Sequence, residues 1–220
     1  MKVFKKEDVF RDSKSWYSAN PEGAVSGNVI SMCRKMAGKR ILDLGCATGS
    51  YCLELAKLGF DCTGAETNEE YVKIAVSRGV KTVLIKDKLP FGDKSFDTVL
   101  LIEVLEHVPD PGRLLKEAGR VAKKNVIITV PDNSAFKELR KEYLTYEHML
   151  EQDHINFFTK ESLTELLNGY FKRCEIDEGD PICFHRMLPA YIRKFVSLMY
   201  RLGLVKSSVF TRLYAECSIE

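Results

Sequence analysis

The sequence predicts an α/β domain built on a doubly wound, mostly parallel sheet of seven strands. From residue 40 onward, short apolar runs alternate with amphipathic helical patterns. The central runs are apolar throughout, which is typical of parallel strands covered by helices on both faces. The length of 220 residues fits one such domain, spanning residues 1–220.

Each element follows from its local pattern. Five apolar runs are the predicted parallel strands, at residues 41–44, 61–65, 81–85, 96–102 and 125–130. Helices are predicted between them at residues 51–58, 68–77 and 110–122. Asn68 is a suitable N-cap for the second helix, and Pro111 supplies a fixed φ in the first turn of the third. Two later strands, at residues 171–177 and 211–219, complete the sheet.

Three further segments decorate this core. Residues 1–38 are predicted as an N-terminal helical cover, and residues 132–158 as a polar excursion after the fifth strand. Residues 182–206 form an apolar, basic helical insertion between the last two strands, and every charge from Arg186 to Arg212 is positive. A wide apolar face with a basic stripe is typical of a helix on a membrane surface, so residues 186–206 are a candidate peripheral membrane contact. Packing against the domain or a dimer partner is the alternative.

Composition excludes several classes of protein. Lys and Arg number 33 and Asp and Glu 31, so the chain is close to neutral and nucleic acid is an unlikely partner. The seven cysteines are odd in number and include no C-x-x-C pair, which disfavours a disulfide framework and a zinc finger. The charged N-terminus and the lack of a long uncharged window predict a cytoplasmic chain with no membrane span.

The turn after the first strand carries the clearest chemical signal. A dinucleotide fingerprint would need glycine at positions 45, 47 and 50, but the sequence has Gly45, Ala47 and Ser50. NAD and FAD are therefore disfavoured. What remains is Asp43 followed by G-x-x-x-G, which resembles motif I of the class I S-adenosylmethionine-dependent methyltransferases, in their broad type 11 and type 23 groups. The common form of that motif has a glycine where this chain has Ala47.

Two later segments extend the resemblance. Glu66 lies 21 positions after Gly45 at the end of the second strand, where the family's acidic residue holds the cofactor ribose. Residues 89–97 resemble the family's LPF…FD segment, which leaves Asp87 or backbone alone to bind the adenine. The resemblance implies a site for S-adenosylmethionine formed by Asp43, Gly45, Cys46, Ala47, Gly49, Glu66, Thr67, Asp87, Ile102 and Glu103.

The turn after the fourth strand brings two carboxylates and an imidazole to the ligand edge of the sheet. Spacings of three and four place Glu103, Glu106 and His107 close together in a single helical turn, which Pro109 prevents from continuing. His107 and Glu106 are the candidate catalytic residues, with His107 as a general base. The bland alternative is a purely structural turn, with His154 capping a helix that begins near residue 160.

This segment is similar to that of the ubiquinone-pathway O-methyltransferases. An E-x-x-E-H cluster with a later histidine holds a metal in the small-RNA 2′-O-methyltransferases, so Glu103, Glu106, His107 and His154 are candidate ligands of a divalent cation. The resemblance implies O-methylation of a small or lipid-linked acceptor. The alternatives are an RNA 2′-O-methyltransferase, an enzyme acting on nitrogen or carbon, or an inactive cofactor-binding partner subunit. Candidates for lining the acceptor pocket are Asn133, Tyr143, Tyr146 and His148.

Overall fold

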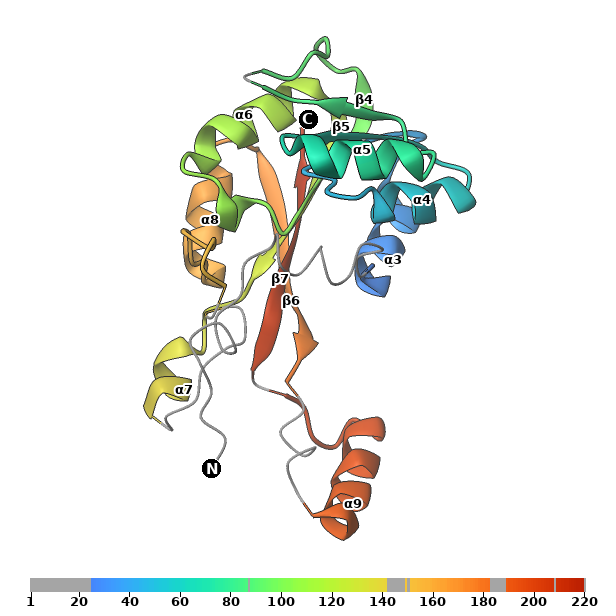
Figure 1. Cartoon of the computed structure of the whole chain (residues 1–220). Helices are drawn as coiled ribbons and strands as arrows, with labels where there is room; N and C mark the ends of the chain where they lie inside the picture. Colours follow the sequence, from blue (N-terminus) through green and yellow to red (C-terminus); the bar gives the residue numbers. More distant parts are fainter. Residues whose placement is uncertain are drawn as a thin grey trace, which may run out of the picture.

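The computed structural model describes residues 25–86, 88–141, 149, 151–182, 189–207 and 209–219. It contains a seven-stranded sheet in the order β3-β2-β1-β4-β5-β7-β6 (Figure 1). The strands are β1 (Arg40–Leu44), β2 (Asp61–Glu66), β3 (Thr82–Leu84), β4 (Phe96–Ile102), β5 (Ala122–Pro131), β6 (Arg173–Pro181) and β7 (Phe210–Ser218). The first five are parallel, and β7 runs antiparallel between β5 and β6. The predicted fold class is confirmed.

Helices cover both faces of this sheet. One core layer packs α3 (Gly27–Met36), α4 (Ser50–Lys57) and α5 (Glu69–Ser77) against strand residues such as Ile41, Leu100 and Ile127. The opposite layer packs α6 (Pro111–Val121) and α8 (Lys160–Asn168) against neighbouring strand positions such as Leu42 and Leu101. Successive strand residues therefore face opposite helical layers, which explains why the central strands are apolar throughout.

The predicted helix starts are confirmed by their caps. The Asn68 side chain accepts hydrogen bonds from the backbone N–H groups of Glu70 and Tyr71 at the start of α5. Pro111 occupies the first turn of α6, where the Asp110 side chain accepts from the backbone N–H of Arg113. These contacts satisfy amide groups that have no partner within the helix.

The three decorating segments are described in part. Residues 1–24 lie outside the described residues, and α3 is the helical element of the predicted N-terminal cover. The excursion after β5 contains α7 (Phe136–Lys141), whereas Tyr143, Tyr146 and His148 fall outside the described part. The insertion between β6 and β7 contains α9 (Ala190–Arg201). No helix within the described ranges combines the length and the hydropathy needed to cross a bilayer.

The cysteines differ from the expectation in one respect. Cys174 on β6 and Cys217 on β7 are opposite each other in the strand register and form a disulfide. The sequence analysis disfavoured a disulfide framework and did not predict this single bond, because spacing along the chain does not reveal which residues an antiparallel register brings together. Within the described ranges, four other cysteines are free and buried: Cys33, Cys46, Cys52 and Cys62.

Candidate active site

The carboxyl ends of the parallel strands define the ligand edge of the sheet. β1 pairs with β2 on one side and with β4 on the other, so the strand order reverses at this point. Ligands of doubly wound sheets bind in the crevice beyond such a switch point. The antiparallel β7 reaches the same edge with its first residues, because Arg212 is opposite Pro131 at the end of β5.

The loop from β1 to α4 is shaped by left-handed backbone conformations. Gly45 and Gly49 have φ angles of 85° and 81°, and a Cβ on Gly45 would lie 2.6 Å from the Val104 side chain. Ala47 also has a positive φ, of 45°. A glycine would adopt this conformation without strain, so the departure from the family motif at Ala47 stores some backbone strain here. Cys46, in the same loop, is buried.

Glu66 fixes the far side of this loop. Its buried carboxylate accepts four hydrogen bonds: from the backbone N–H groups of Ala47, Thr67 and Asn68, at 2.7 to 2.9 Å, and from the Thr67 hydroxyl at 3.2 Å. The carboxylate is therefore held in one position beside the β1 loop and the end of β2. Its interactions with Ala47 and Thr67 bring together three of the residues predicted for the cofactor site.

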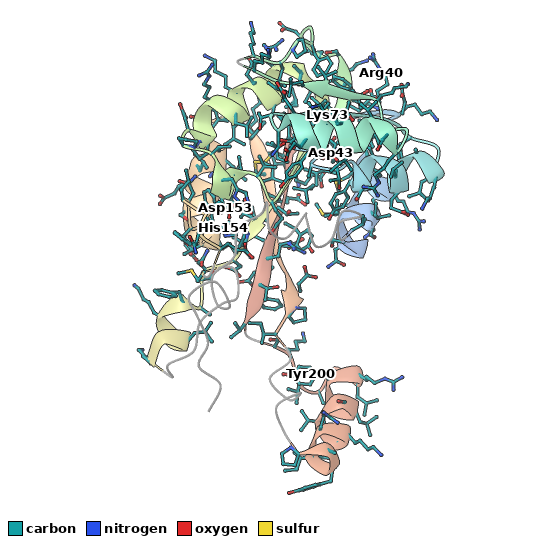
Figure 2. All side chains as sticks on the ribbon, viewed as in Figure 1. Arg40, Asp43, Lys73, Asp153, His154 and Tyr200 are labelled. Atoms are coloured by element: carbon teal, nitrogen blue, oxygen red, sulfur yellow. A yellow bond between two sulfur atoms is a disulfide. The ribbon has the colours of Figure 1, made fainter. Side chains whose placement is uncertain are left out.

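Asp43, labelled in Figure 2, is the fourth residue of β1 and lies two positions before Gly45 of the same loop. Its side chain is buried, and the Cys52 thiol lies 3.9 Å from its carboxylate. Burial raises the pKa of Asp43 to about 7, and the negative charge of Glu66 adds to this effect. Asp43 is therefore a carboxyl group that exchanges its proton near neutral pH.

Three predicted cofactor residues remain: Asp87, Ile102 and Glu103. Asp87 lies outside the described residues. Ile102 ends β4 and is half-buried, and Glu103 follows it with a φ of 54°. One oxygen of the Glu103 carboxylate accepts from the Thr129 hydroxyl at 2.7 Å and from Arg212 Nε at 3.0 Å. These two partners hold the strained residue in place.

Arg212 is a site residue that the sequence analysis missed. Its guanidinium binds Glu103 and also Asp180 Oδ2, at 2.7 Å, and the Tyr214 hydroxyl donates to the same oxygen. Burial acts to lower the pKa of Arg212, but the charge of Glu103 and the Tyr214 and Asp180 side chains outweigh it and raise the pKa. A cavity of about 390 Å³ opens here, lined by Val25, Ser26, Gly27, Asn28, Tyr51, Asp180 and Arg212. The sequence offers one signal for Arg212, which is a cation at the start of the predicted strand at residues 211–219.

A second polar cluster consists of Glu106, His107 and His154. The first two belong to the single 3₁₀ turn η1 (Leu105–His107), so the predicted helical turn forms at these residues. The prediction that Glu103 shares this turn is wrong, since Glu103 lies before it with a φ of 54°. One ligand atom from each of the three residues lies within 4.8 Å of the others. The Glu103 carboxylate is not part of this group, since it is bound to Arg212 and Thr129. The structure therefore brings together three of the four predicted metal ligands.

Glu106 is the unusual member of this cluster. Its side chain is only 1% exposed, and neither carboxylate oxygen has a hydrogen-bond partner among the described residues. Burial raises its pKa well above the ordinary value, and the nearby charge of Glu103 adds to the effect. A buried carboxyl without partners is costly, so this position is suited to a ligand that would satisfy it.

The backbone around residue 154 orients the two histidines. His107 Nδ1 lies 3.2 Å from the Asp153 carbonyl oxygen, which can only accept, so Nδ1 carries the proton. In this tautomer Nε2 of a neutral His107 carries the lone pair, which is the form that binds a metal ion or accepts a substrate proton. The rings of His107 and His154 meet edge to face, with centroids 4.6 Å apart. Asp153 and His154 lie on the α8 side of the sheet (Figure 2).

The alternative prediction that His154 caps the helix beginning near residue 160 is wrong. The N-cap of α8 is Thr159, whose side chain forms a capping box with Ser162. Asn156 ties the segment to η1, since its side-chain amide donates to the carbonyl oxygens of Leu105 and Val108. His154 is therefore held beside Glu106 and His107 and does not cap the helix.

The strand order, the loop after β1 and the acidic residue at the end of β2 define an S-adenosylmethionine-dependent methyltransferase of class I. Residues 25–170 match the family model described as a methyltransferase domain, and the chain belongs to this family.

Related proteins agree on the reaction but differ in acceptor atom. The chain is 31% identical over 122 residues to a ubiquinone biosynthesis O-methyltransferase of Caulobacter sp., covering 51% of this chain and 48% of that protein. It is 36% identical over 102 residues to norajmaline N-methyltransferase of Rauvolfia serpentina, covering 42% and 35%. The chain thus spans about half the length of the first relative and about a third of the second.

A solved structure agrees in fold. A SAM dependent methyltransferase from Archaeoglobus fulgidus superimposes with a TM-score of 0.66 at 17% identity, covering 94% of this chain and all of that one.

Proposed function

We propose that this methyltransferase transfers its methyl group to a hydroxyl oxygen of a small or lipid-linked acceptor, at the cluster of Glu106, His107 and His154. One observation carries the proposal: the buried Glu106 carboxylate has no hydrogen-bond partner among the described residues and lies within 4.8 Å of two imidazoles at the ligand edge. A neutral amine is nucleophilic without losing a proton first. A hydroxyl reacts faster when its proton is removed, and this cluster is suited to that task.

The donor set fits a divalent cation. One carboxylate and two imidazoles are common metal ligands, and the hydrogen bond from His107 Nδ1 to a backbone carbonyl is typical of ligating histidines. A bound cation would lower the pKa of a coordinated acceptor hydroxyl. In this proposal His107 and His154 orient that hydroxyl, and His107 Nε2 accepts its proton where no metal is bound.

The cofactor side of the site follows from the β1 loop. Glu66, already fixed by backbone amides, is proposed to accept hydrogen bonds from the ribose hydroxyls, and the glycine-containing loop to pass beneath the methionine part. Methyl transfer needs little covalent help from the protein. Holding the acceptor oxygen in line with the activated methyl supplies most of the rate enhancement.

The surface beside the cluster favours an apolar acceptor. Ile155 and Phe157 alternate with Asn156 and Phe158, so their side chains point outward next to His154 while the other two point inward. Both outward side chains are exposed. They offer an apolar surface beside the cluster, which suits an acceptor with a hydrocarbon portion better than a polar nucleic acid.

A Glu106→Gln variant tests whether the Glu106 carboxylate binds a metal ion or has only a structural role. Gln keeps the shape and neutrality of a protonated Glu106 but is a much weaker metal ligand. Calorimetric titration with magnesium or manganese, in the presence of S-adenosylhomocysteine, should show metal binding to the wild type and none to Glu106→Gln. Methylation of a panel of alkyl phenols and catechols should fall at least a hundredfold in the variant.

The control is Glu165→Gln, the same change at an exposed position of α8. It should leave both measurements unchanged, and all three proteins should bind S-adenosylhomocysteine. Full activity and unchanged metal binding in Glu106→Gln would show that Glu106 is structural and would remove the proposal. Transfer only to amines, or only to an RNA 3′ end, would replace the proposed acceptor class.

A further inference from the structure

Helix α9 has no side chain that is fully buried against the part of the chain that the structure describes. In the chain it comes after β6 and before β7, and none of its twelve residues is buried. In Figure 1 it stands beyond the ends of these two strands, far from helices α3 to α6. An isolated helix of this length is marginal in water, because most helical stability in proteins comes from packing an apolar face.

The exposed side of α9 is an apolar stripe. Tyr191, Phe195, Leu198 and Leu202 follow one another at spacings of four, three and four, which places them on one face. Their exposed fractions are 76%, 63%, 51% and 62%. Leu204 and Val205, directly after the helix, are also exposed. Side chains of this size are rarely left in water as a continuous row, so the stripe is an interaction surface.

The charges around the stripe favour an anionic partner. Lys194 and Arg201 lie along one side of it, and Lys206 follows the helix. No acidic residue occurs anywhere from residue 181 to residue 215. A second copy of the chain would bring the same basic residues together in an antiparallel or parallel pair, which like charges oppose. The interface of an anionic lipid bilayer has an apolar interior and a negatively charged boundary. It therefore matches both the apolar stripe and the basic residues beside it.

Helix α9 lies on the same side of the sheet as the ligand edge. The β6–β7 hairpin leaves the sheet at the ligand edge, since Arg212 is opposite the end of β5 and Phe210 is opposite Pro181. A bilayer in contact with α9 would thus lie on the side of the sheet where ligands enter.

We propose that α9 is a membrane-docking helix, which inserts Tyr191, Phe195, Leu198 and Leu202 into the headgroup region of an anionic bilayer. Lys194, Arg201 and Lys206 contact the lipid phosphates. The docking rests on α9 alone; its use in delivering a lipid-linked acceptor rests on the function proposed above.

Vesicle co-sedimentation of the full-length protein tests the docking without any acceptor. At low salt the wild type should sediment with phosphatidylcholine vesicles that contain phosphatidylglycerol, and much less with phosphatidylcholine alone. A Phe195→Ser/Leu198→Ser variant should lose at least tenfold in partitioning, because it removes two inserted side chains. Lys194→Gln/Arg201→Gln should lose about 25-fold, at about fivefold for each cation, and this loss should shrink at high salt.

Val76→Ser is the matched control, since Val76 is an exposed apolar residue on another helix, α5. It should partition like the wild type. Absence of vesicle binding by the wild type would overturn the proposal, as would binding that both α9 variants retain. Light scattering gives a further outcome against it: a dimer that Phe195→Ser/Leu198→Ser converts to monomer, with no vesicle binding, would assign the stripe to self-association. None of these outcomes bears on methyl transfer to a soluble acceptor, so the two proposals fail separately.

Discussion

Asp43 should make the stability of this protein depend on pH in a predictable direction. Its pKa is about 7 in the folded chain, compared with an ordinary value of 3.8. Between these values the folded chain keeps a proton that the unfolded chain has released. The free energy of unfolding therefore falls as the pH rises from about 4 to about 7, and stays lower above that. Ionisation of Asp43 lowers the free energy of unfolding by about 4 kcal/mol in all. About 3 kcal/mol of this decrease occurs between pH 5 and pH 8.

An Asp43→Asn variant removes this titration while keeping the size of the side chain. Urea unfolding at pH 5, 6, 7 and 8 should show the variant gaining about 3 kcal/mol relative to the wild type across the range. The exposed Asp177→Asn on β6 controls for the loss of one negative charge. Parallel stability curves for wild type and Asp43→Asn would refute the reasoning, because they would mean that Asp43 ionises at the same pH in both states.

Three other perturbations follow from the geometry. Gly45→Ala should lower the free energy of unfolding by about 1–3 kcal/mol in urea titrations, because its Cβ would meet Val104 and its φ is positive; an unchanged midpoint would contradict this. Glu66→Ala should weaken S-adenosylhomocysteine binding by about 1–3 kcal/mol in calorimetry, and equal affinity would remove the ribose assignment. Reducing the Cys174–Cys217 disulfide, which closes a loop of 43 residues, should lower unfolding free energy by up to about 4 kcal/mol. A thermal unfolding midpoint insensitive to dithiothreitol would show that the bond contributes nothing.

The elements and the local turns of this protein could be predicted from its sequence because their causes are local. The apolar strands, the Asn68 cap and the one-turn helix at Glu106 and His107 each depend on residues close together in the chain. The β1 loop could be assigned from its glycines, although the left-handed conformation of Ala47 could not, since alanine carries no such signal.

The contacts of β7 could not be predicted, because they depend on a register between distant segments. Nothing near Arg212 in the sequence indicates that it pairs with Glu103, 109 positions earlier. The same register brings Cys174 and Cys217 together. The resemblance to the small-RNA 2′-O-methyltransferases indicates His154, but its position beside η1 depends on Asn156, which binds the carbonyl oxygens of that turn.

The pairing of Arg212 with Glu103 changes the charge of the proposed cation site. Had Glu103 joined Glu106, two carboxylates would neutralise a divalent ion and weaken its attraction for an oxygen anion. Arg212 and Thr129 instead hold the Glu103 carboxylate, at the cost of a left-handed backbone at that residue. A divalent ion held by one carboxylate and two neutral imidazoles would keep a net positive charge. Such an ion would stabilise the negative charge that develops on an acceptor hydroxyl as its proton leaves. The strained Glu103 and its half-buried ion pair with Arg212 of β7 are thus parts of one arrangement, which would set the electrostatics of the proposed cation site.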